Sequence, residues 1–105
     1  GVFRPYGERA KEIVGHRAKV FRVGRILDVR MADEIVRLGQ ADMVAMTRAQ
    51  MADPYLVAKA REGREDEIVR CDCEDACDKQ VAEGKPAVCA RWPKEKLRAW
   101  REKVA

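Results

Sequence analysis

The chain has 105 residues, of which 38% are charged and 6% aromatic, and its formal net charge is +4. Acidic and basic residues are interleaved along most of it, which is typical of solvated helix faces and argues against a nucleic-acid-binding surface. No apolar run approaches the roughly 20 residues that span a bilayer, and the first residues lack the apolar core of a signal peptide. We therefore expect a cytoplasmic protein with a modest core, and neither a membrane nor nucleic acid as a partner.

The first half of the chain predicts a strand, a helix and a second strand, preceded by another helix. The first helix is expected over residues 6–14 and the first strand over residues 19–23. Asp28 is a suitable N-cap for the helix that follows. Residues 42–46 are nearly all apolar, as expected of a strand buried on both faces of a parallel sheet. The pattern predicts a β-α-β unit.

The second half predicts two more helices with a loop-rich segment between them. Asp53 is expected to be the N-cap of one helix, with Pro54 in its first turn and Gly63 near its end. Beyond that point the composition changes and cysteines appear. The last helix is expected over residues 93–104. Three residues should form its inner face: Leu97, Trp100 and Val104.

Four cysteines lie close together in the second half: Cys71, Cys73, Cys77 and Cys89. Without an export signal, such a cluster indicates metal ligands rather than disulfides. Four thiolates are the usual ligands of a [4Fe–4S] cluster and equally of structural zinc. Cys71 and Cys73 are separated by a single residue, the shortest spacing in the group. An iron–sulfur cluster, a zinc ion and no metal all remain open.

Several motifs in a fixed order resemble the iron–sulfur branch of the Old Yellow Enzyme family, which includes 2,4-dienoyl-CoA reductase and trimethylamine dehydrogenase. They are VGRI, ADMVAMTRAQMADP, KAREGREDEI and then the cysteines. The resemblance implies an α/β fold: residues 1–63 would be the last two β/α units of a flavin-binding TIM barrel. Residues 64–92 would be a cysteine-rich metal or cluster segment, and residues 93–105 a C-terminal helix.

The resemblance also implies cofactor sites. The phosphate of FMN would lie at the turns after the two strands, Gly24-Arg25 and Thr47-Arg48, where TIM barrels often bind phosphate. Glycine lets a backbone approach phosphate closely, and Arg48 can add a charge-assisted hydrogen bond. Thr47 stands where the family more often has glycine. Gly24 as a simple turn residue and Arg48 as a surface charge remain the alternative.

The cysteine spacing here is C-x-C-x3-C-x11-C, whereas the family pattern resembles C-x2-C-x3-C-x11-C. The last three cysteines fit that pattern, and Cys71 is one residue too close. The resemblance implies that all four bind a [4Fe–4S] cluster, with zinc as the alternative.

The resemblance implies the C-terminal portion or a subunit of an FMN-dependent oxidoreductase that reduces activated C=C bonds or oxidises amines, with NAD(P)H as an electron donor. The catalytic residues would lie on earlier strands and are unknown here. Two strands cannot close a barrel, so we expect a partner, either the rest of the barrel or further copies, and an inactive isolated chain. A stand-alone cysteine-ligated metal-binding module and a purely structural assembly piece are the other hypotheses.

Overall fold

The computed structural model describes residues 4–104, and the side chains of residues 5–103. The chain divides into two compact units, Gly1–Ala49 and Gln50–Ala105, and each is described by itself. Within the described residues no helix is long and apolar enough to cross a membrane. The functional divisions expected at residues 63 and 92 stay predictions.

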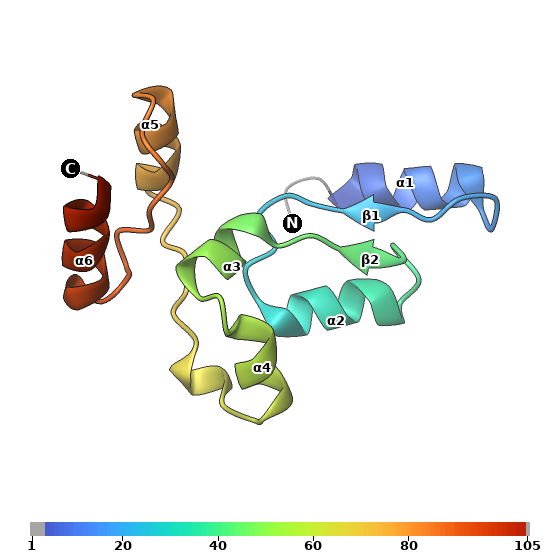
Figure 1. Ribbon diagram of the computed structural model, residues 1–105. Coiled ribbons are helices and arrows are strands. Elements are labelled where there is room, and N and C mark those ends of the chain that lie inside the picture. The colour runs from blue at the N-terminus through green and yellow to red at the C-terminus, as the bar shows by residue number, and fades with distance from the viewer. Residues whose placement is uncertain (1–3, 105) are drawn as a thin grey trace. The chain divides into compact units, whose positions relative to one another are not determined.

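The first unit contains the predicted β-α-β arrangement (Figure 1). Its elements are α1 (Arg4–Val14), β1 (Phe21–Arg22), α2 (Val29–Arg37) and β2 (Met43–Val44). The two strands are parallel, with Phe21 opposite Met43 and Arg22 opposite Val44. Helix α1 packs on β1 and α2 packs on β2. The element order is confirmed, although each strand is two residues long and therefore shorter than expected.

Local sequence signals explain where α2 begins and what it buries. The Asp28 carboxylate accepts a hydrogen bond from the Arg30 backbone N–H at 2.8 Å, as predicted for an N-cap. Ala32 and Ile35 lie three positions apart and are both buried. Gly39 follows the helix with φ +70°, a conformation that glycine adopts readily.

A partly buried carboxylate joins α1 to the starts of both strands. The two oxygens of Asp42 accept hydrogen bonds from Lys11 Nζ at 2.9 and 2.7 Å, and one of them also accepts the Val20 backbone N–H at 2.8 Å. These hydrogen bonds, that from Lys11 foremost, hold the pKa of Asp42 below its ordinary value. Asp42 therefore fixes the end of the sheet at which the strands begin.

The strand at residues 42–46 was expected to be buried on both faces, and this is wrong for the described chain. Successive strand residues point to opposite faces. Arg22 is 3% exposed, whereas its neighbour Phe21 is 63% exposed and the paired Met43 is 52% exposed. One face of the sheet lies under helices, and no described element of the first unit covers Phe21 and Met43.

Two helices are additional to those predicted. Helix α3 (Thr47–Ala52) follows β2, and α5 (Ala76–Ala82) lies in the cysteine-bearing segment. Helix α4 (Leu56–Arg61) begins two residues later than expected, and a 3-10 turn, η1 (Glu65–Glu67), follows it. Asp53 does not cap α4, because the N-cap position is Tyr55. Asp53 belongs to the turn ahead of the helix, where its backbone carbonyl accepts the Leu56 N–H and its carboxylate accepts the Tyr55 N–H.

The last predicted helix is confirmed as α6 (Lys94–Val104). Leu97 and Trp100 are half-buried, consistent with an inner face, and the side chain of Val104 lies outside the described residues. Just before the helix, the Trp92 indole N–H donates a hydrogen bond to the Met51 carbonyl at 2.7 Å. This bond ties the start of α6 to the end of α3 within the second unit.

Candidate functional site

A small cavity of about 60 Å³ lies where β1 and β2 end. Residues of both loops line it, including all four that were predicted to bind phosphate: Gly24, Arg25, Thr47 and Arg48. The Ala45 N–H donates to the Arg22 carbonyl at 2.8 Å, which continues the parallel pairing beyond β2 and keeps the two loops adjacent. The structure therefore brings the four predicted residues to one place.

The first loop has an unusual backbone. Gly24 has φ +127° and Arg25 has φ +50°. Positive φ is uncommon for residues other than glycine and costs of order 1–3 kcal/mol, so the surrounding structure must hold Arg25 in place. Ile26, which is 2% exposed, provides that anchor directly after it. The loop is thus held in a conformation that a free chain would rarely adopt.

The second loop differs from the prediction. Thr47 and Arg48 were expected to form a turn, whereas they are the first two residues of α3. Met46 and Ala49 are buried on either side of them. Arg48 is half-buried and Thr47 is exposed. A short extra helix near the last two strands is a recurrent part of phosphate sites in TIM barrels.

The residues that line this cavity give it a positive charge. Arg25 and Arg48 both contribute to it, and among the described residues no acidic side chain does. Guanidinium groups match the geometry of phosphate oxygens, and free backbone N–H groups in such loops can add further donors. The residues present fit a phosphate group, and the small volume suits such a group rather than an aromatic ring.

The cysteines form no disulfide, and each is half-buried. Cys73 has φ +60°, and its backbone N–H donates to Cys71 Sγ at 3.3 Å. The backbone therefore turns at Cys73. Cys77 lies on α5, and Cys89 lies beyond that helix next to the buried Val88.

The four thiols as placed do not form a metal site. In the part of the chain that the structure describes, no group of three or more histidine, cysteine, aspartate or glutamate side chains is arranged to hold a metal ion. Neither an iron–sulfur cluster nor zinc fits this arrangement without movement of the segment. The assignment of Cys71, Cys73, Cys77 and Cys89 as ligands stays a prediction.

Sequence reasoning missed the role of Asp53. Its carboxylate is 3% exposed and accepts hydrogen bonds from Lys59 Nζ at 2.6 Å and from the Tyr55 and Val69 N–H groups at 3.0 Å. Burial alone would raise the pKa of Asp53, but these hydrogen bonds, that from Lys59 foremost, outweigh it and lower the pKa. Val69 is sixteen residues away, so no local signal could have indicated this contact.

Residues 4–67 match the family model described as the NADH:flavin oxidoreductase / NADH oxidase family. The chain is 39% identical over 69 residues to a probable N-methylproline demethylase of Rhizobium meliloti (strain 1021), covering 66% of this chain and 10% of that protein. It is 34% identical over 70 residues to an N,N-dimethylglycine/sarcosine dehydrogenase of Chromohalobacter salexigens, covering 67% and 10%.

A solved structure is also similar, that of 6-hydroxypseudooxynicotine amine oxidase from Pseudomonas geniculata N1. The TM-score is 0.79 at 26% identity, over 87% of this chain and 13% of that chain. The chain spans about a tenth of the length of the curated relatives that it matches. These matches confirm the resemblance found in the motifs. The chain therefore belongs to the NADH:flavin oxidoreductase / NADH oxidase family and corresponds to part of its TIM-barrel domain.

Proposed function

We propose that this chain supplies the phosphate-binding corner of an FMN-dependent oxidoreductase. The observation that carries the proposal is the cavity after β1 and β2, where Gly24, Arg25, Thr47 and Arg48 meet. Its two arginines and lack of acidic residues favour an anion, and the family is one of flavin enzymes. The relatives named as demethylases and dehydrogenases of methylated amines favour amine oxidation, and C=C reduction is the alternative.

In this scheme the chain binds and orients the cofactor. Arg25 and Arg48 would neutralise the phosphate, and the backbone of Gly24 would approach its oxygens. FMN, when bound, supplies hydride-transfer chemistry, with NAD(P)H as a donor in the reductase alternative. The phosphate contacts lie away from the reacting ring, so they contribute affinity and position rather than chemistry.

The uncovered face of the sheet supports a need for the rest of the barrel. Phe21 and Met43 are paired across the two strands and lie on the face opposite Arg22. Val23, two residues after Phe21, is exposed on the same face. We propose that further barrel strands, from another part of the protein or from another chain, cover these side chains. Without them we expect no oxidoreductase activity.

The cysteine-bearing segment is the second part of the proposal. We propose that Cys71, Cys73, Cys77 and Cys89 bind a [4Fe–4S] cluster in the complete protein, with zinc as the alternative. The hydrogen bond from the Cys73 N–H to Cys71 Sγ supports it, because proteins tune iron–sulfur clusters through hydrogen bonds to the sulfurs. Cys77 and Cys89 would have to approach this pair when the cluster forms. No catalytic step is assigned to it.

The test of the phosphate site is FMN retention by the complete protein. Arg48→Ala should weaken FMN binding by about 1–3 kcal/mol, the range for hydrogen bonds to charged groups. Arg37→Ala is the matched control, because Arg37 is exposed on α2 and pairs only with Asp33 at 3.5 Å among its described ion pairs. An FMN dissociation constant unchanged by Arg48→Ala would refute the assignment.

A further inference from the structure

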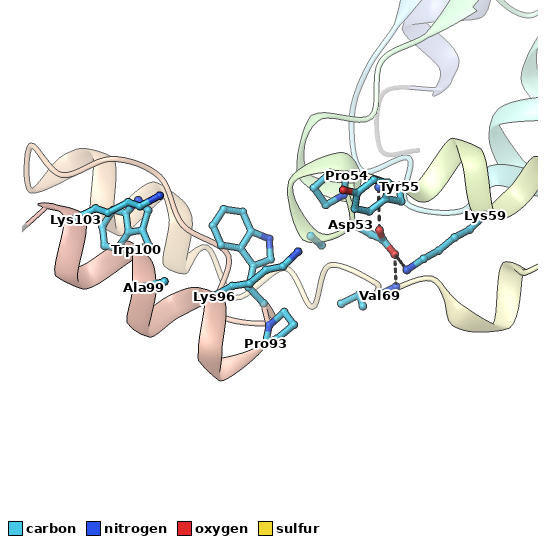
Figure 2. Close-up of a pocket in the computed structure, with 12 residues that line it drawn as sticks. Asp53, Pro54, Tyr55, Lys59, Val69, Pro93, Lys96, Ala99, Trp100 and Lys103 are labelled. Atoms are coloured by element: carbon cyan, nitrogen blue, oxygen red, sulfur yellow. Dashed lines mark hydrogen bonds and ion pairs between the residues drawn. The ribbon is translucent and has the colours of Figure 1, made fainter.

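A second and larger cavity of about 460 Å³ lies in the second unit, between the start of α4 and the face of α6 that carries Lys96, Trp100 and Lys103. Figure 2 shows Asp53, Pro54 and Tyr55 on one side of it and Lys96 and Trp100 of α6 on the other. Its volume lies within the range typical of small-molecule sites. The proposed FMN phosphate site does not use any of its residues.

Three aromatic side chains line the cavity: Tyr55, Trp92 and Trp100. The Trp92 indole N–H is committed to the Met51 carbonyl at 2.7 Å, which fixes the orientation of that ring and leaves its faces for packing. Tyr55 is exposed, and Trp100 is half-buried. Planar ligands stack on such side chains, because aromatic rings offer large flat surfaces at low conformational cost.

The charge of the lining is positive. Lys59, Lys96 and Lys103 contribute to it, and Asp53 is its one acidic residue. The Asp53 carboxylate is buried and accepts hydrogen bonds from Lys59 and from two backbone N–H groups. The positive charge of Lys59 is therefore balanced by that of Asp53, whereas Lys96 and Lys103 are exposed. Lys96, Trp100 and Lys103 share one helix face by their spacing, so two ammonium groups flank an indole.

We propose that this cavity binds a small planar aromatic molecule that carries a negative charge. The ring would pack against Trp100, and the anionic group would lie near Lys96 and Lys103, which are on the same face of α6. Both a nucleotide and an aromatic carboxylate have this chemistry. Recognition would depend on both parts of the ligand, because neither stacking nor two solvated lysines alone gives much affinity.

The test is isothermal titration of the full chain with two aromatic anions, AMP and 2-naphthoate, and with their neutral counterparts, adenosine and 2-naphthamide. At least one anion should bind about tenfold more tightly than its neutral counterpart, and the tighter of the two anions identifies the ligand source. Equal affinity for anion and neutral counterpart in both pairs, or no binding of either anion, would overturn the proposal.

Variants locate the binding. Trp100→Ala should weaken it about tenfold, whereas Trp100→Phe should retain most of it. Lys96→Gln should weaken binding and reduce its salt dependence, while Lys94→Gln, the same change on the same helix outside the lining, should leave it unchanged. If Trp100→Ala fails to fold, the comparison of Lys96→Gln with Lys94→Gln still tests where the ligand binds. Loss of AMP binding in Arg48→Ala instead would assign it to the other cavity and overturn the proposal.

Discussion

Replacement of Asp53 by alanine should destabilise the second unit strongly. The Asp53 carboxylate is buried and joins three segments: the turn before α4, the side chain of Lys59 on α4, and the Val69 backbone beyond η1. Lys59 Nζ also donates to the Glu67 carbonyl at 3.0 Å, so the same lysine holds η1. The substitution removes the acceptor for one ammonium group and two backbone N–H groups.

The magnitude follows from these contacts. Removal of one partner of a buried ion pair costs about 3–5 kcal/mol, because the other charge is left without compensation. Each buried N–H without an acceptor adds about 1–3 kcal/mol, but the terms share one site and are not additive. We expect a loss of about 3–5 kcal/mol for Asp53→Ala and about half of that for Asp53→Asn, which keeps one acceptor oxygen.

Urea unfolding followed by tryptophan fluorescence measures this loss, since both tryptophans, Trp92 and Trp100, belong to the second unit. Asp78→Ala is the matched control. Asp78 is exposed in the first turn of α5, where an acidic residue contributes at most about 1 kcal/mol. If Asp53→Ala and Asp78→Ala were equally stable, the role given to the buried carboxylate would be wrong.

The pH dependence gives an independent check. The folded pKa of Asp53 lies below its ordinary value of 3.8. Such a group contributes stability that is fully present above the unfolded pKa and is lost as the pH falls through the folded pKa. The unfolding free energy of the second unit should therefore decline as the pH drops below 3.8, and this decline should be smaller in Asp53→Asn.

Three further predictions concern other parts of the chain. Gly7→Ala should destabilise the first unit by about 1–3 kcal/mol in urea unfolding followed by circular dichroism, because a Cβ atom would lie 2.7 Å from Cδ of the buried Arg22; a gain in stability would contradict this packing. Cys77→Ser should reduce the iron and sulfide content of the complete protein to background, and wild-type content would rule out the cluster. The chain should sediment as an oligomer or in a complex with a larger chain, and alone it should not reduce an enone; a compact monomer that reduces an enone with NAD(P)H would show that the rest of the barrel is unnecessary.

The candidate phosphate cavity could be predicted from the sequence because its geometry follows from topology. Once residues 19–23 and 42–46 are parallel neighbours, the loops after them must meet at the same edge. The N-cap role of Asp28 could be predicted equally well, since an N-cap side chain accepts a hydrogen bond from a backbone N–H two residues further on. These features depend on local patterns and on one pairing rule.

The features that could not be predicted depend on distant or missing contacts. Helices α3 and α5 are six and seven residues long, too short for a periodic pattern to distinguish them from loops. The Asp53–Val69 contact joins residues far apart in sequence. The apolar run at residues 42–46 is typical of a strand that is covered on both faces, and the described part of the first unit covers one face of the sheet only. Met43 is therefore exposed although its sequence context indicates burial.

Asp42 stabilises the fold at one end of the sheet, away from the residues that line the phosphate cavity. Its contacts with Lys11 and Val20 lie where the strands begin, whereas the phosphate cavity lies where they end. Substitutions in the loops after the strands can accumulate without breaking the hydrogen bonds of Asp42 at the other end, so selection can act on the two ends independently. A sheet that is anchored at one end can accept changes in the loops at its other end at little cost in stability.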